Sequence, residues 1–184
     1  MSLPVHWVES LAEAVVGGTV EVTGDEAHHA VAVRRLRVGE SVVLTDGRGR
    51  SVTGAVSATS KRVFAVTAMS LTDLPEPTPA VVVVQAIPKG DRGELAVEVL
   101  TEIGVARIVP WAASRSVAVW KGERGEKALA RWRSTAREAS KQARRSWFAE
   151  VEPMVTTSGV ITLMSRCEKT IVLHEDARAT FASL

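Results

Sequence analysis

The stretch that most constrains the fold of this chain covers residues 81–116. It contains an apolar run, a charged loop, an amphipathic segment, a second apolar run and a second charged loop. This order is typical of a parallel β-α-β unit. Ligands of open α/β sheets bind at the carboxyl ends of the strands, so both charged loops should emerge at one edge. We therefore expect the chemistry of the protein at that edge.

Periodicity predicts the elements in and around this unit. Residues 81–87 are nearly all apolar, as expected for a strand covered on both faces. Residues 90–104 have apolar positions at helical spacing and end at Gly104, a natural stop for a helix. We expect further strands at residues 107–110 and 171–173, and a second helix over residues 126–145.

The first part of the chain has a different pattern, which predicts a separate domain. Residues 15–71 alternate in short apolar and polar steps between turns, as in an all-β module, with a short helix over residues 25–36. Three prolines in residues 74–79 predict a stiff, extended linker. We predict an all-β domain over residues 1–73, this linker, and an α/β domain over residues 80–184.

Composition and motifs exclude several classes of function. The single cysteine, Cys167, rules out an internal disulfide and fits a reducing cytoplasm, and no apolar run approaches the ~20 residues of a membrane-spanning helix. The loop after residues 81–87 is neither a dinucleotide fingerprint nor a Walker loop, and the four histidines lack the spacing of a zinc site. We expect a cytoplasmic protein without a metal and without a membrane partner.

The distribution of charge points to a polyanionic ligand. The net charge is only +2, but Lys and Arg outnumber the acids in residues 28–62 and again in residues 121–148. Arginine suits phosphate because its planar guanidinium can donate two parallel hydrogen bonds. An ordinary solvated face is the alternative, and for the first cluster it stays open. The predicted RNA-binding residues are Arg34, Arg35, Arg37, Arg48, Arg50, Gln142 and Arg145.

Several separate motifs together resemble the RsmE family. In chain order they are His28-His29 through Gly39-Glu40, Thr45-Asp-Gly-Arg-Gly49, Gln85-Ala-Ile-Pro-Lys-Gly-Asp-Arg92, Thr101-Glu-Ile-Gly104, Arg107-Ile-Val-Pro110, Ser114-Arg-Ser116, and Arg131-Trp132 through Gln142-Ala-Arg-Arg145. Members of this family use S-adenosylmethionine to methylate a uridine at N3 in 16S ribosomal RNA, and they are usually homodimers. The resemblance implies a PUA-like β-barrel that binds RNA, followed by a SPOUT-type α/β methyltransferase domain. The implied partner is 16S ribosomal RNA or the small ribosomal subunit.

The sequence departs from the family near its end. The family has a Gly-Pro-Glu-Gly-Gly loop and a later Leu-Arg segment, which form the trefoil knot and most of the adenosylmethionine pocket. Neither occurs before Leu184, so we expect the carboxyl-terminal knot to be missing from this chain. Leu173, His174 and Glu175 match the family position that borders the cofactor. His174 could equally be a buried, hydrogen-bonded imidazole.

The resemblance also implies roles for the charged loops. Methylation at N3 places negative charge on the uracil, which fixed cations can stabilise, and a paired base must first flip out of its helix. A salt bridge from Arg92 to Asp91 or Glu94 at the helix start is the alternative for that residue. The candidate catalytic residues are Lys89, Arg92 and Arg115, with Gln142 and Arg145 as second choices on the target-base side.

Two other functions stay open at this point. A non-catalytic RNA-binding protein of the same architecture would not bind S-adenosylmethionine. A small-molecule α/β enzyme would make the basic clusters irrelevant, so that charge reversal at Arg34 and Arg35 would leave RNA affinity and its salt dependence unchanged.

Overall fold

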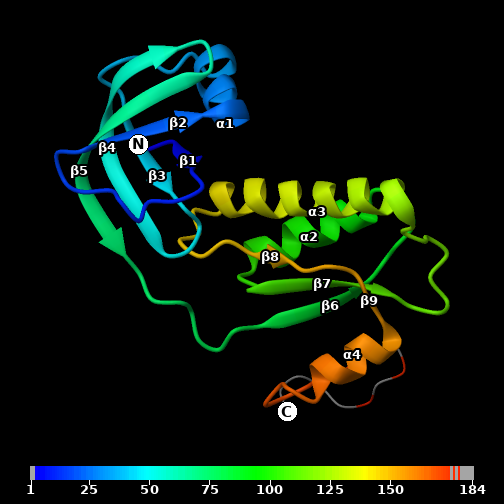
Figure 1. Cartoon of the computed structure of the whole chain (residues 1–184). Helices are drawn as coiled ribbons and strands as arrows, with labels where there is room; N and C mark the ends of the chain where they lie inside the picture. Colours follow the sequence, from blue (N-terminus) through cyan, green and yellow to red (C-terminus); the bar gives the residue numbers. More distant parts are fainter. Residues whose placement is uncertain (1–2, 175, 177, 179–184) are drawn as a thin grey trace.

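The chain forms two sheets, each with its own hydrophobic core (Figure 1). The computed structural model describes residues 3–174, 176 and 178. The first sheet ends with β5 at Asp73, and the second begins with β6 at Val82. The segment between them is extended and crosses the space between the two parts.

The first sheet is strongly curved and has five strands in the order β1-β3-β4-β5-β2. The strands are β1 (Val5–Trp7), β2 (Thr19–Thr23), β3 (Ser41–Thr45), β4 (Arg50–Ser60) and β5 (Val63–Asp73). All neighbours are antiparallel except β1 and β3, which are parallel. Register shifts along β4 and β5 bend the sheet around its core.

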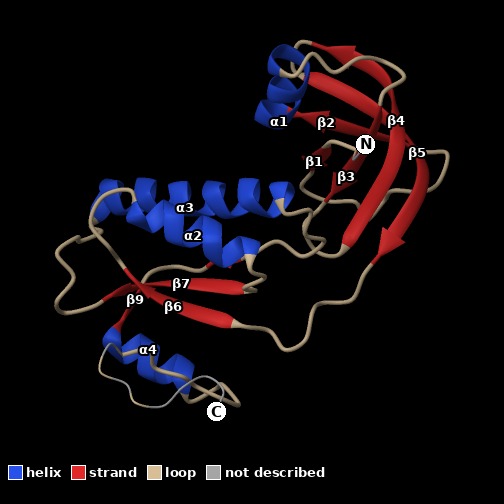
Figure 2. Ribbon diagram, turned by 180° about the vertical axis from the view of Figure 1, so that it is seen from behind, coloured by secondary structure: helices blue, strands red, loops and turns tan. Residues whose placement is uncertain are grey.

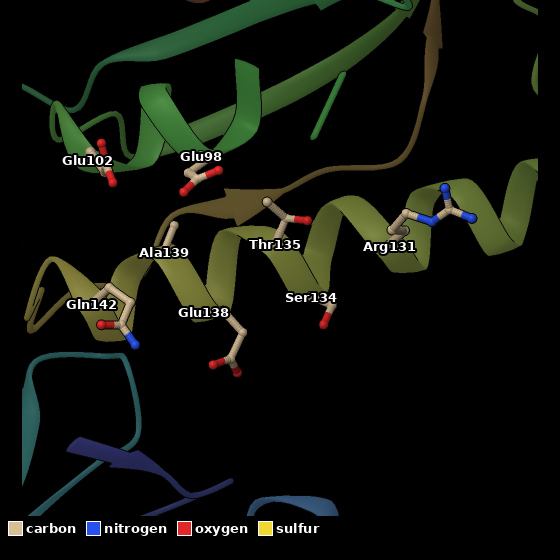
Figure 3. Close-up of a pocket in the computed structure, with 8 residues that line it drawn as sticks. All are labelled: Glu98, Glu102, Arg131, Ser134, Thr135, Glu138, Ala139 and Gln142. Atoms are coloured by element: carbon tan, nitrogen blue, oxygen red, sulfur yellow. The ribbon is translucent and has the colours of Figure 1, made fainter. Parts of the chain in front are cut away.

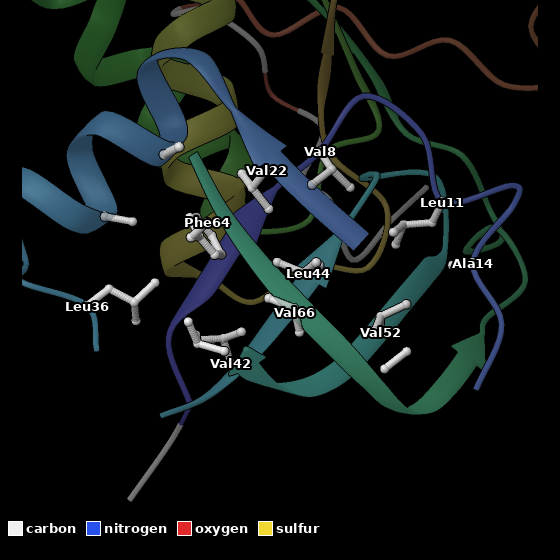
Figure 4. Close-up of a cluster of buried hydrophobic side chains, with 14 residues drawn as sticks. Val8, Leu11, Ala14, Val22, Leu36, Val42, Leu44, Val52, Phe64 and Val66 are labelled. Carbon is white, nitrogen blue, oxygen red and sulfur yellow. The ribbon is translucent and has the colours of Figure 1, made fainter. Parts of the chain in front are cut away.

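Alternate residues of these strands point into one shared core (Figure 4). Phe64 is the largest of its fully buried side chains. Burial of this apolar surface is the main favourable contribution to the stability of the module. Other members are Leu11, Val22, Val42, Leu44, Val52 and Val66.

The expected helix within the β module is shorter than predicted and irregular. It begins as α1 (Gly24–His28) and continues as one π-helical turn, η1 (His29–Val33). Arg35 then has a left-handed backbone with φ of 56°, which turns the chain so that Leu36 enters the core. Burial of Leu36 therefore ends the helix before residue 36, where the sequence pattern had placed its end.

The second sheet is parallel, and its centre is the predicted β-α-β unit. β6 (Val82–Ala86) leads through α2 (Arg92–Glu102) to the neighbouring strand β7 (Arg107–Ala112). α3 (Gly122–Gln142) packs beside α2 on the same face of the sheet. The hydrophobic core of this α/β part surrounds Trp132. Its other buried members include Val97, Val105, Ile108, Ala136 and Val151.

The expected strand at residues 171–173 is wrong. Those residues have no regular structure, and their side chains are exposed, so no neighbouring strand holds them. Two short strands pair with β7 instead, β8 (Glu150–Val151) and β9 (Val155–Thr156). α4 (Thr157–Met164) follows β9 on the face opposite α2 and α3 (Figure 2). β6 is only half-buried throughout, so it is less covered than a strand enclosed on both faces.

The two parts meet at the carboxyl end of α3. Lys141 of α3 donates hydrogen bonds of 2.9 Å to both carboxylate oxygens of Glu26 in α1. Arg137, one turn earlier, lies over the Trp7 ring of β1 at 4.7 Å from the ring centroid. This contact fixes the β module at one end of the helical layer.

The segment after α3 adds a second contact between the parts. Residues 146–148 run beside the tight turn between β3 and β4. The Gly49 backbone N–H donates to the Ser146 carbonyl, and the Phe148 N–H donates to the Gly47 carbonyl. The Trp147 indole N–H donates to the carbonyl of Leu74. Backbone hydrogen bonds of this kind leave little freedom for the two sheets to rotate against each other.

None of the helices in the described part of the chain is long and apolar enough to cross a membrane.

Candidate RNA-binding and catalytic site

Two loops leave the second sheet at the same edge. Ala86 of β6 pairs with Trp111 of β7, and Ala112 pairs with Thr156 of β9, so these strands end side by side. Residues 87–91 and 113–121 begin there as loops. The predicted shared edge is therefore present.

The three candidate catalytic cations are exposed in and beside these loops. Lys89 and Arg115 lie in loops, and Arg92 is the first residue of α2. None of the three has an ion pair or a side-chain hydrogen bond within the described residues, so each is available to an incoming anion. The alternative salt bridge of Arg92 is wrong, because within the described residues Arg92 pairs with neither Asp91 nor Glu94, and Glu94 instead pairs with Arg131 at 3.3 Å.

One buried side chain, Trp132, contacts both the first turn of α2, which follows the first loop, and the second loop itself. The Trp132 ring lies against Gly93, where an added Cβ would approach its Cζ2 at 2.7 Å. The same ring meets Trp120, which ends the second loop, edge to face at 4.9 Å between centroids. The local sequence pattern does not predict this arrangement, because nothing in it shows that Gly93 and Trp120 share a neighbour.

The predicted RNA-binding residues divide into two groups. Arg34, Arg35, Arg37 and Arg48 on the β module are exposed, and so is Gln142. Arg50 instead donates to the Ala14 carbonyl at 3.3 Å and lies near Asp73. Their proposed contact with RNA stays a prediction.

Arg145 is engaged in structural hydrogen bonds. Its guanidinium donates to the carbonyls of Thr101 at 3.0 Å and Val105 at 2.7 Å, between the end of α2 and the start of β7. Burial lowers the pKa of Arg145 below its usual value. These hydrogen bonds hold the Arg145 side chain against the loop between α2 and β7.

The second-choice residues and the catalytic candidates lie at opposite ends of α3. Gln142 and Arg145 are at its carboxyl end beside the β module, whereas the catalytic candidates lie near its first turn. A helix of 21 residues is about 30 Å long. The structure therefore does not bring the second-choice residues to the side of Lys89 and Arg115.

The groove between α2 and α3 has the wrong charge for RNA. It has a volume of about 320 Å³ and contains three glutamates (Figure 3). Like charge would repel a phosphate backbone. Among residues 3–174, 176 and 178, no group of three or more His, Cys, Asp or Glu side chains is placed to hold a metal ion. The lining residues are Glu98, Glu102, Arg131, Ser134, Thr135, Glu138, Ala139 and Gln142.

The predicted cofactor residues lie in an irregular segment after α4. Leu173 is 78% exposed. His174 is also exposed, with its Nδ1 at 3.9 Å from a carboxylate oxygen of Asp176, so the alternative of a buried imidazole is wrong. Glu175 lies outside the described residues. An open leucine and an open imidazole do not enclose an adenosine, so these two side chains do not fit a complete cofactor pocket.

Comparisons with known proteins identify the class. The protein-family model for the RNA methyltransferase domain matches residues 75–184. The family model for the RNA methyltransferase PUA domain matches residues 22–67. Ribosomal RNA small subunit methyltransferase E from Mycobacterium bovis is 37% identical over 177 residues, which cover 94% of this chain and 67% of the relative. The Bacillus subtilis protein of the same name is 26% identical, and the match covers 62% of that protein.

Solved structures have the same architecture. Ribosomal RNA small subunit methyltransferase E from Neisseria gonorrhoeae, bound to S-adenosyl methionine, superposes with a TM-score of 0.78 at 25% identity. The alignment covers 87% of this chain and 65% of that structure. A putative methyltransferase from Legionella pneumophila, at 21% identity and a TM-score of 0.86, supports the fold.

The two family models, together with the matching architecture of a solved relative, define an RNA methyltransferase with a PUA domain. The chain belongs to the RNA methyltransferase family that includes ribosomal RNA small subunit methyltransferase E. This confirms the predicted family, the PUA-like and SPOUT-type fold class and the enzyme class. The chain spans about two thirds of the length of these relatives.

Proposed function

We propose that this chain binds 16S ribosomal RNA and methylates a uridine at N3 with S-adenosylmethionine as the methyl donor. The observation that carries the proposal is the pair of cationic loops at one sheet edge, in a chain of the RNA methyltransferase family. Relatives named for the small ribosomal subunit and a relative bound to S-adenosyl methionine support the substrate and the donor.

The role of the cations follows from the chemistry at N3. Before the new bond to the methyl group forms, the N3–H bond breaks, its proton passes to solvent water, and negative charge spreads to the two uracil carbonyl oxygens. Formation of the N3–C bond then leaves the base neutral. S-adenosylmethionine, when bound, supplies a methyl group on a positively charged sulfur. Lys89, Arg92 and Arg115 hold the base and stabilise the charge on its oxygens. No covalent bond between protein and uracil is needed.

Leu173, His174 and Glu175 stay our prediction for the cofactor side. Because the two described side chains are open to solvent, we derive no step of the reaction from them. The residues assigned here act on the RNA.

We further propose that the protein is a cytoplasmic homodimer that uses no metal. An exposed apolar stripe on α2 and its C-cap residue, formed by Leu95, Val99 and Ile103, supports a partner on that helix. These residues are spaced by four along the helix, so they share one face. In sedimentation, the double variant Leu95→Lys/Ile103→Lys should have half the mass of the unchanged dimer. A monomeric mass for the unchanged protein would contradict the dimer.

A methylation assay tests the proposed function. The chain is incubated with unmodified small-subunit RNA and S-adenosylmethionine, and 3-methyluridine is measured by mass spectrometry of the digested RNA. We expect Arg115→Gln and Lys89→Gln each to lower kcat/KM on the order of 100-fold. Arg166→Gln changes an exposed arginine two residues after α4; it is the control and should leave the rate unchanged.

Two outcomes separate the proposal from the non-catalytic alternative. RNA binding without 3-methyluridine, together with no heat of S-adenosylmethionine binding in titration calorimetry, would favour an RNA-binding protein. If Arg115→Gln and Arg166→Gln methylate RNA at equal rates, the cation of Arg115 at the shared sheet edge has no role in the reaction.

A further inference from the structure

The loop between β7 and α3 exposes apolar side chains beside the candidate catalytic cation. Val117 is 82% exposed and Val119 is 64% exposed, two and four residues after Arg115. Single exposed valines are common on protein surfaces. Val117 and Val119 differ from the other exposed valines because they lie at the shared edge of the second sheet.

The loop presents both valines on one side. From residue 117 to 121 the side chains alternate between exposed and half-buried, as in an extended segment with one face against the protein. The inner face includes Trp120, which rests on Trp132. The outer face therefore carries two valines and, next along it, Lys121.

This outer face combines the two properties that a flipped pyrimidine requires. A uracil has flat apolar faces that lose water on binding, and an edge with oxygens that gain negative charge during methylation. The valines offer apolar surface, and Arg115 and Lys121 flank it with positive charge.

We propose that Val117 and Val119 contact the unstacked face of the target uracil, on a loop that Trp120 and Trp132 hold in position. This inference rests on the proposed function and extends it, because it separates recognition of the base from attraction of the phosphates. The cations supply the salt-dependent part of the affinity, and the valines supply a part that depends on the base.

The test compares two RNAs that differ only in the target base. One is an oligonucleotide with the uridine that the assay shows to be methylated, and the other has an abasic site there. Val117→Ser/Val119→Ser should weaken binding of the uridine RNA about tenfold and of the abasic RNA less than twofold. The salt slope should stay unchanged, whereas Arg115→Gln should reduce it by about one.

A matched pair of valines controls for the loss of apolar surface. Val15 and Val16 are 63% and 65% exposed and lie on the β module, away from the sheet edge. Val15→Ser/Val16→Ser should leave both affinities unchanged. All variants replace exposed side chains, so we expect each to fold, and thermal unfolding checks this.

Three results would overturn the inference. They are an equal loss on both RNAs, no loss on either RNA, and a change in sedimentation mass without a change in RNA affinity, which would assign the valines to a protein interface. If the unchanged protein fails to bind the uridine RNA, the proposed function itself fails, and this inference fails with it.

Discussion

Glu26 joins the two halves of the molecule at the scale of a single residue. Burial alone would raise the pKa of its carboxyl group, but hydrogen bonds from His6 and Lys141 and the charge of Lys141 outweigh that effect. The pKa falls from 4.5 to about 2. The His6 Nδ1 lies 3.1 Å from the carboxylate, and Lys141 is itself buried. A buried amine and a buried carboxylate each need the other.

Removal of the Glu26 charge should therefore destabilise the fold. We expect Glu26→Gln to lower the free energy of unfolding at pH 7 by about 3 kcal/mol, because the buried Lys141 then keeps only the exposed Glu138, at 3.2 Å, as a counter-charge. Urea denaturation measures this change. Asp25→Asn is the control, since Asp25 is fully exposed and its pair with Arg62 lies at the surface. Equal stability of the two variants would contradict the role of Glu26.

The same contact predicts a dependence on pH. A carboxyl group with a lowered folded pKa contributes stability above its unfolded pKa, near 4.5, and loses it as the pH falls toward about 2. The difference in unfolding free energy between the unchanged protein and Glu26→Gln should be constant above pH 5 and should shrink between pH 4.5 and 2. A difference that stays constant across that range would show that folding does not lower the pKa of Glu26.

At the scale of elements, the turn between β3 and β4 positions the β module on the α/β layer. Gly49 has φ of 94°, and a Cβ there would collide with the Leu74 carbonyl oxygen and the Trp147 ring. Gly39 has nearly the same φ, 90°, but has open space around it. The two glycines therefore differ in contact with neighbours and hardly in backbone conformation.

This pair gives a matched prediction. Gly39→Ala should lower the unfolding free energy by about 1 kcal/mol from backbone strain, and Gly49→Ala by about 2 kcal/mol more from the collision. Thermal or urea unfolding of both variants measures the difference. Equal losses would mean that the Trp147 contact does not hold the parts together.

The same scale shows how far the sequence predicts the structure. α2 and the neighbouring strands follow a long apolar period, and their positions agree with the prediction to within a few residues. β8 and β9 were missed because two-residue strands have no period to detect. Residues 171–173 were misassigned because three apolar residues in a row also occur on a surface.

The candidate site could be predicted only in part, for a related reason. Lys89 and Arg115 follow strands, so topology alone places them at one edge. Glu26 and Lys141 are 115 residues apart, and no local pattern links them. The structural use of Arg145 also depends on two carbonyls more than 39 residues away, which a charge pattern does not reveal.

At the scale of the whole molecule, the exposed arginines of the β module and the catalytic candidates lie at opposite ends of α3. A ligand that touches both must extend about 30 Å, the length of that helix. The contacts of Glu26 and of residues 146–148 hold this span fixed. A folded RNA has both the size and the regular phosphate spacing to match it.

Photo-crosslinking to RNA tests this account most directly. Small-subunit RNA with 4-thiouridine in place of uridine is bound to the full chain and irradiated, and the crosslinked peptides are identified by mass spectrometry. We predict crosslinks in residues 87–92 and 113–121 at the sheet edge, together with residues 34–37 on the β module. Crosslinks confined to α4 or to the acidic groove between α2 and α3 would contradict the account.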